Sequence, residues 1–184
     1  MKKILVIILG SFLITGCFGA TKDDGLIDYD KSQYFSMRIP NNWEIIENKD
    51  GILPKPRSGN IELAVSAKDD NKGFFLNNLL ILSEDLKTEI SASDYIESAT
   101  LKNDENYFEF KKISKKEINF SDGNKSSISI FEARYNDRTP KIKFLQTANI
   151  CKNNKGFFLT IAIPTSIENT SKYEYMLSTF GCKK

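Results

Sequence analysis

KIKFLQTANICKNNKGFFLTIAIP, residues 141–164, predicts two long β-strands joined by a turn. Apolar residues recur along Lys141–Cys151, the run Asn153–Gly156 has the composition of a turn, and Phe157–Ile163 is a second apolar strand that ends at Pro164. Strands joined by so short a turn pair antiparallel. On the first strand we expect the inward side chains to be Ile142, Phe144, Ala148 and Ile150.

The preceding residues extend this pair into a meander. Tyr107–Ile113 and Lys116–Phe120 have strand composition, Asp122-Gly123 is a strong hairpin turn, and Ser126–Tyr135 is the return strand. Strands that follow one another in this way from residue 107 to 163 indicate one antiparallel sheet.

Four shorter strands are predicted nearer the N-terminus. Tyr34–Pro40 and Ile61–Ala67 alternate between apolar and polar residues, as half-buried strands do, and Glu44–Asn48 follows the only tryptophan, Trp43. Asn78–Ser83 is a continuous apolar run, so we expect it to be covered on both faces.

Two helices complete the pattern. Ser91-Ala-Ser-Asp94 is a capping box before a helix to about Lys102, and Ser171-Lys-Tyr-Glu174 is a second one. Strands, a helix, more strands and a final helix predict an α+β domain, an antiparallel sheet with helices packed on its faces. The apolar stripe of the last helix, expected to pack in the core, is Tyr173, Met176, Leu177 and Phe180.

The first sixteen residues have the composition of an export signal. Lys2 and Lys3 precede an apolar core of about eleven residues, too short to span a bilayer as a helix. Ile14-Thr-Gly-Cys17 resembles the bacterial lipobox. The resemblance implies that residues 1–16 are removed and that Cys17 carries a diacylglycerol and an amide-linked acyl chain such as palmitate. The alternative is an ordinary secretory signal that happens to contain a cysteine.

Residues 17–30 are predicted to be a flexible tether between the lipid and the folded domain. Their four aspartates lack the spacing, the glycine and the closing glutamate of an EF-hand calcium loop. Phe18 follows the cysteine, where aspartate favours retention in the inner membrane. We therefore expect the periplasmic face of the outer membrane, rather than the inner membrane or a Gram-positive cell surface.

Two cysteines remain in the predicted exported domain, Cys151 and Cys182. They are expected to form a disulfide, which would favour an oxidising periplasm, and the alternative is a pair of free buried thiols. Closing a loop of about thirty residues would contribute roughly 3–4 kcal/mol to stability.

Charge and composition exclude several functions. Without residues 1–16, which hold two lysines and no acids, the chain has 24 basic (26 − 2) and 24 acidic residues. A neutral chain is a poor ligand for nucleic acid. The sequence has no histidine, which excludes Ser-His-Asp and Cys-His catalysis and most zinc sites. We expect no catalytic, cofactor or metal site.

Several segments, in order, resemble the PsbP-like superfamily. They are Phe35-Ser-Met-Arg-Ile-Pro-Asn-Asn-Trp43, Ser91-Ala-Ser-Asp-Tyr-Ile-Glu97, Phe131-Glu-Ala-Arg-Tyr135, Phe144-Leu-Gln-Thr-Ala148 and Gly156-Phe-Phe-Leu-Thr-Ile-Ala-Ile-Pro164, followed by the closing helix. The resemblance implies that residues 31–184 are a PsbP-like α/β/α sandwich. Members generally lack catalysis and bind or stabilise partner proteins.

Four local features could carry chemistry, but each has a simpler interpretation. The pair Asp94 and Glu97 is expected to be a solvated helix face, Trp43 a plug at the end of the core rather than a pocket wall, and Ser121 a hydroxyl without a base. Four lysines could meet anionic headgroups or an acidic partner, although a solvated strand edge is the simpler interpretation: Lys111, Lys112, Lys115 and Lys116.

The function predicted from the sequence is therefore a non-enzymatic, lipid-anchored envelope lipoprotein that binds or stabilises a protein partner. The alternative is a carrier of a small molecule or lipid in a cavity between sheet and helix, lined by Phe74, Phe75, Phe157 and Phe158. A hydrolase that uses carboxylates alone is a third, weaker hypothesis.

Overall fold

The computed structural model describes residues 24–184, apart from 49–50, 52, 54, 57, 69–74 and 102. The predicted signal peptide, Cys17, the first part of the tether and Phe74 lie outside the described residues.

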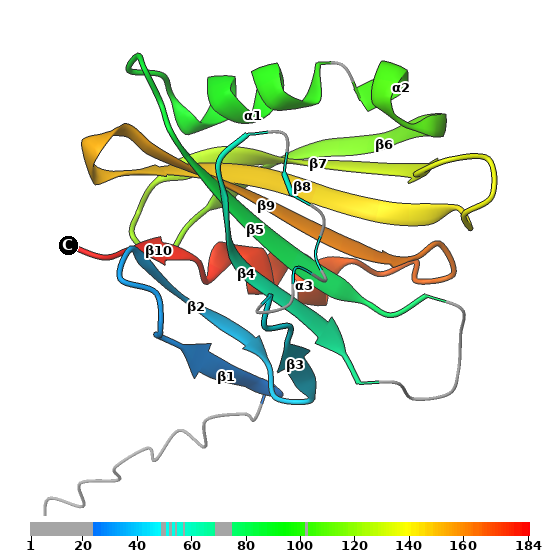
Figure 1. Cartoon of the computed structure of the whole chain (residues 1–184), viewed down its shortest axis with the longest axis horizontal. Coiled ribbons are helices and arrows are strands. Elements are labelled where there is room, and N and C mark those ends of the chain that lie inside the picture. Colours follow the sequence, from blue (N-terminus) through cyan, green and yellow to red (C-terminus); the bar gives the residue numbers. More distant parts are fainter. Residues whose placement is uncertain are drawn as a thin grey trace, which may run out of the picture.

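The fold is α+β, as the sequence predicts, with helices on both faces of a large antiparallel sheet (Figure 1). That sheet has the strand order β3-β4-β5-β9-β8-β7-β6. Its strands are β3 (Trp43–Ile45), β4 (Asn60–Ala67), β5 (Asn78–Asp85), β6 (Phe108–Asn119), β7 (Lys125–Arg134), β8 (Ile142–Cys151) and β9 (Lys155–Pro164).

Two layers cover this sheet. Helix α1 (Ala92–Thr100) and the single-turn α2 (Asn103–Asn106) lie over one face (Figure 1). The other face is covered by α3 (Ser171–Ser178) and a small antiparallel sheet of β1 (Leu26–Tyr29), β2 (Phe35–Pro40) and β10 (Gly181–Cys182). Within the described residues, none of the helices has the length and apolar character needed to cross a bilayer.

The strand pair β8–β9 lies near the centre of the large sheet and is paired without a bulge from Ile142–Pro164 to Cys151–Lys155. The predicted inward set on β8 was incomplete, because the strand is covered on both faces. Its even-numbered residues face α1, whereas Leu145 is fully buried on the α3 side.

Three phenylalanine rings form the centre of the core on the α3 side. Phe35 of β2 stacks on Phe180 with ring centroids 4.9 Å apart, and both rings lie 5.5 Å from Phe157 of β9. All three side chains are fully buried. The predicted apolar stripe of α3 packs here too, and so does Trp43, which is a core residue as predicted.

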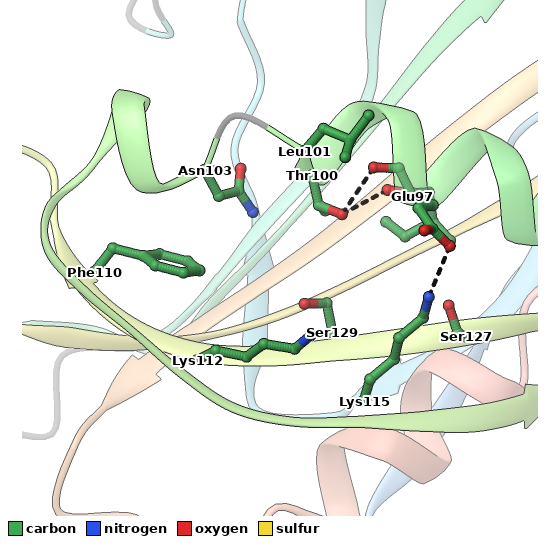
Figure 2. A pocket seen from close by; sticks show the side chains of 10 residues that line it. Glu97, Thr100, Leu101, Asn103, Phe110, Lys112, Lys115, Ser127 and Ser129 are labelled. Carbon is green, nitrogen blue, oxygen red and sulfur yellow. Dashed lines mark hydrogen bonds and ion pairs between the residues drawn. The ribbon is translucent and has the colours of Figure 1, made fainter.

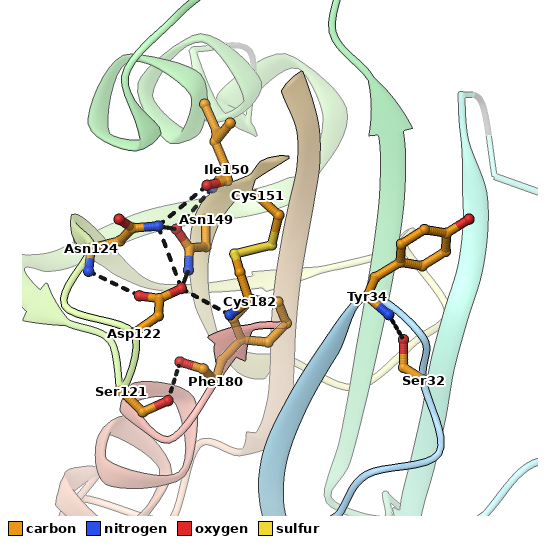
Figure 3. The surroundings of a disulfide bond; sticks show 10 residues. All are labelled: Ser32, Tyr34, Ser121, Asp122, Asn124, Asn149, Ile150, Cys151, Phe180 and Cys182. Carbon is orange, nitrogen blue, oxygen red and sulfur yellow. Dashed lines mark hydrogen bonds between the residues drawn. A yellow bond between two sulfur atoms is a disulfide. The ribbon is translucent and has the colours of Figure 1, made fainter. Parts of the chain in front are cut away.

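The C-terminus is fastened to the sheet by the predicted disulfide between Cys151 and Cys182, whose Cα atoms are 5.4 Å apart (Figure 3). Beside it, the carboxylate of Asp122 accepts hydrogen bonds from the Cys182 backbone N–H (2.9 Å) and from Asn149 Nδ2 (3.0 Å). Gly181 lies so close to this turn that a Cβ would be 2.3 Å from Ser121 Oγ. The β6–β7 turn is therefore a structural latch, with Ser121 Oγ donating to the backbone of the segment after α3.

Replacing Asp122 by alanine is expected to lower the free energy of unfolding by about 2 kcal/mol, because fully buried Asn149 loses its charged acceptor. Urea denaturation measures the change. Asp137→Ala, in the exposed β7–β8 turn, is the matched control and should change stability by less than about 0.5 kcal/mol. Equal effects of the two substitutions would contradict the claim that the hydrogen bonds of Asp122 stabilise the fold.

Some predicted boundaries were wrong. The tether was placed at residues 17–30, but Leu26–Tyr29 is strand β1, paired with β2, so the folded domain begins earlier. The predicted break after the first helix contains α2, and the two strands predicted over residues 107–120 are one strand, β6, with two bulges.

Two further expectations need correction. Strand β5 is not covered equally on both faces, because Leu79 and Ile81 are buried while Leu80 and Leu82 are half-buried. The second capping position was one residue late: Thr170, not Ser171, is the N-cap of α3, and its hydroxyl donates to Glu174 Oε1 (2.6 Å).

Candidate functional site

A cleft of about 240 Å³ lies between the C-terminal half of α1 and strands β6 and β7 (Figure 2). It is the cavity between sheet and helix that best fits a binding role, since it combines charged, hydroxyl and apolar side chains. Its lining residues are Ile96, Glu97, Thr100, Leu101, Asn103, Phe110, Lys112, Lys115, Ser127 and Ser129.

Helix α1 is held over the sheet at its N-terminal end. Ser91 caps it as predicted, with its Oγ accepting from the Asp94 N–H at 3.0 Å. Tyr95 donates its hydroxyl to Glu84 of β5 at 2.6 Å, and burial, with this hydrogen bond, raises the pKa of Tyr95 above its usual range. A Cβ at Gly156 would be 2.9 Å from the Tyr95 ring, so glycine there permits the close approach of helix and sheet.

Polar side chains lie in and behind the lining of the cleft. Buried Asn103, in α2, donates through Nδ2 to Gln146 Oε1 of β8 at 3.1 Å, and Gln146 in turn reaches Thr160 Oγ1 at 3.3 Å. Ser127 of β7 is only 8% exposed, and its hydroxyl has no hydrogen-bond partner among the described residues.

Two lysines of β6 line the cleft on the sheet side, Lys112 beside Ser129 and Lys115 beside Ser127 (Figure 2). Lys115 Nζ is 3.0 Å from Glu97 Oε2 of α1. Lys112 has no ion-pair partner within the part of the chain that the structure describes. Ile96, Leu101 and Phe110 also line the cleft, so it offers donors and apolar surface together.

The lysine cluster predicted from the sequence is divided between the two faces of β6. Lys112 and Lys115 pair with Phe131 and Ser129 and face the cleft. Lys111 pairs with Glu132 on the opposite face, and on that side Lys116 binds Glu174 of α3 at 2.7 Å. Strand β6 is an edge of the sheet, as predicted.

The carboxylates Asp94 and Glu97 are not brought together for catalysis. Asp94 accepts from the Ser91 hydroxyl at 2.6 Å, while Glu97 pairs with Lys115. Among the described residues, no group of three or more side chains of the usual metal-binding types lies together.

The three described aromatic residues that were proposed to line a cavity do not meet around one. Phe157 is fully buried on the α3 side of the sheet, Phe158 packs near Tyr95 on the α1 side, and Phe75 joins a separate cluster. That lining was wrong, because neighbouring residues of a strand point to opposite faces.

A second, more open groove lies between β2 and α3, with a volume of about 550 Å³. Arg38 crosses its wall and binds Asp24, which lowers the pKa of that carboxyl through the hydrogen bond. The same guanidinium donates to the backbone carbonyl of Leu26 at 3.1 Å. These contacts hold β1 in place, so we assign this groove a structural role.

Solved structures of other proteins resemble this chain, although their sequence identity to it is low. A Pseudomonas aeruginosa protein of unknown function, PA94, is 12% identical, with 86% of this chain and 98% of that one covered and a TM-score of 0.49. The Saccharomyces cerevisiae Ran-binding protein Mog1p is 8% identical, with 85% and 94% covered and a TM-score of 0.51. This chain shares the α+β fold of Mog1p. No protein-family model and no curated protein matches the sequence.

Proposed function

We propose that this chain is a non-enzymatic lipoprotein of the cell envelope, anchored through Cys17, whose folded domain binds or stabilises a partner protein. The lipobox, the resemblance to PsbP-like domains and the fold shared with a Ran-binding protein support this proposal. Proteins that share a fold can have different functions, so the proposal depends on the surface residues of this chain.

The observation that carries the proposal is the exposed apolar surface along edge strand β6. Among the described residues, seven large apolar or aromatic side chains are exposed, and four of them lie on β6 or on the segments that adjoin it. Exposed apolar side chains on and beside an unpaired strand edge are a common feature of protein interaction sites. The four are Leu101 (69% exposed), Phe108 (57%), Ile113 (46%) and Tyr135 (51%).

The lysines of β6 define the chemistry of the partner. Lys111 and Lys112 lie beside Ile113 on the exposed edge, so a surface with apolar side chains and carboxylates would complement it. The two bulges in β6, together with its lysines, oppose unselective pairing with other strands.

The anchor would also orient the domain. Leu26 follows Cys17 by nine residues, a length that reaches at most about 30 Å. Because β1 lies in the layer opposite α1, this layer would be held near the membrane and α1 would point away from it (Figure 1). We place the protein on the periplasmic face of the outer membrane, on the basis of Phe18.

Site-specific photo-crosslinking in the cells that naturally produce the protein tests this surface. A photoreactive amino acid at Ile113 is expected to give a discrete adduct with one envelope protein. The matched control is Ile27 of β1, which is similarly exposed (50%, against 46% for Ile113) but lies in the layer that the anchor would hold near the membrane. Adducts that are the same from both positions, or none from position 113, would contradict the proposal.

The alternative is a carrier of a small ligand. One observation favours it: the cleft beneath α1 has both polar and apolar lining residues and a volume of about 240 Å³. This is slightly below the usual range of pockets for drug-sized ligands, so the ligand would have to be small.

A further inference from the structure

We propose that the partner protein is held by strand addition, in which an extended segment of the partner pairs with the outer edge of β6 along Ser114–Asn119. The segment carries acidic residues near both of its ends. This binding mode rests on the partner-binding function proposed above and specifies how the surface along β6 would hold its partner.

The backbone hydrogen bonds of the β6–β7 hairpin decide which groups of β6 face outward. The Phe120 N–H donates to Asn124 O at 2.8 Å, so the backbone of Phe120 faces β7. In an antiparallel pair, residues that bond to the neighbouring strand alternate with residues whose backbone groups point away from it. In the regular stretch the backbone N–H and C=O groups of Lys115, Glu117 and Asn119 therefore point to the outer edge.

This edge is long enough to take another strand. Strand β6 is the last strand of the large sheet, and within the described residues no strand pairs with its outer side. Its two bulges both precede Ser114, and its register with β7 is regular from there to Asn119. Six residues is about the length of an average strand. The opposite edge strand, β3, has only three.

The same stretch is open to solvent. Its side chains are exposed at four positions, Lys115, Lys116, Glu117 and Asn119, and helix α1 packs mainly against β7 and β8. Unpaired donors and acceptors on an exposed strand edge are the groups that strand addition uses. Main-chain hydrogen bonds then give the affinity, and the side chains around the edge select the sequence.

The charges around the edge select an acidic segment. The two lysines inside the stretch already pair with carboxylates of α1 and α3. Beyond one end lie Lys111 and Lys112, and beside the other end lies Lys125, which pairs with Asn119 across the hairpin. Among the described residues these three lysines have no ion-pair partner. Two carboxylates about six to eight residues apart on an extended segment would reach both ends.

A second copy of this chain is a poorer occupant of the edge. Strand β6 carries four lysines and two glutamates, so the pairing of two copies edge to edge would bring two positively charged strands together. Like charges directly opposite one another destabilise a strand pair. An acidic segment avoids this repulsion and adds attraction.

Proline at outward-facing positions tests the binding mode in the cells that naturally produce the protein. Glu117→Pro and Asn119→Pro each remove one outward N–H, and edge strands tolerate proline in this orientation. Combined with the photoreactive amino acid at position 113, each should reduce the adduct about tenfold or more. The matched control is Ile45→Pro, also outward-facing because the adjacent Ile46 N–H donates to β4, and it should leave the adduct within about twofold.

Two further measurements address the free edge and the charge of the segment. In the purified mature protein in detergent, the amides of Lys115 and Glu117 should exchange about tenfold or more faster than that of Lys116, which donates to β7. Slow exchange at the outward positions would overturn the proposal. Lys125→Glu should reduce the adduct at position 113 about fivefold, and an unchanged adduct would overturn the acidic character of the segment.

The outcomes separate the binding mode from the function on which it rests. An adduct that persists in both β6 proline variants would overturn strand addition but leave partner binding at this surface in place. Loss in only one of them, or in Ile45→Pro as well, would overturn it too, because the free edge would not be the cause. A melting temperature lowered by more than about 10 °C in both would show that these amides bond to β7, with the same consequence.

The identity of the adduct decides the remaining cases. An adduct between two copies of this chain would overturn the proposed acidic segment. If the otherwise unchanged protein gives no adduct from position 113, both the binding mode and the partner-binding function are contradicted.

Discussion

Replacing Cys151 and Cys182 together by serine is expected to lower the free energy of unfolding by about 3–4 kcal/mol. The disulfide joins residues separated by 31 positions. Without this cross-link the unfolded chain gains conformational entropy, which lowers its free energy by about 3–4 kcal/mol for a loop of this length. Both cysteines are only half-buried, so the loss of packing adds little. Urea denaturation of the double variant and the oxidised wild type measures the difference.

A matched control comes from the wild type itself. Reduced with excess dithiothreitol, it should unfold at the same urea concentration as the double serine variant. A loss below about 1 kcal/mol would show that the Asp122 latch and the pairing of β10 with β2 hold the C-terminus without the covalent bond.

Replacing Phe35 by alanine is expected to lower the free energy of unfolding by about 3–5 kcal/mol. The ring is fully buried and joins three elements, since it contacts Tyr29 of β1, Phe157 of β9 and Phe180 after α3. Its removal leaves a cavity that fixed neighbours cannot fill.

Phe108→Ala is the matched control for this substitution. The same side chain is removed from a position that is 57% exposed, so the expected change is below about 1 kcal/mol. Chemical denaturation of both variants gives the comparison. Similar losses at Phe35 and Phe108 would mean that the Phe35–Phe157–Phe180 cluster is not the centre of the core.

The sequence predicted the elements whose signals are local. The capping box at Ser91, the hairpin turn at Asp122 and the alternating strand pair over residues 141–164 all depend on neighbours within a few positions. The disulfide could be expected because the domain is predicted to be exported, and two cysteines in an oxidising compartment most simply pair with each other.

The elements that could not be predicted, β1 and α2, form through contacts with distant parts of the chain. Strand β1 has only four residues, too few for a periodic signal, and it forms because β2 offers an edge and Arg38 binds Asp24. The helical turn α2 is polar throughout, but Asn103 is buried against Gln146 of β8. Neither contact has a local signature.

The cleft could not be predicted for a related reason. The bulges in β6 decide which lysines face α1, and a register shift of one residue moves every side chain to the other face. The run Lys111–Lys116 therefore indicated a charged edge, but not that Lys112 would share a cleft with Ser127. The unpartnered hydroxyl of Ser127 is visible only once β7 is placed under α1.

Intact mass spectrometry of the protein from its native membranes, with and without reduction, tests the proposed anchored domain most directly. We expect the mass of residues 17–184 plus a diacylglycerol and an acyl chain, two hydrogens lighter before reduction. Cys17→Ser should abolish the lipid mass and leave the disulfide intact. An unlipidated wild-type mass would contradict the membrane anchor, and with it the proposal that this domain acts at the surface of a membrane.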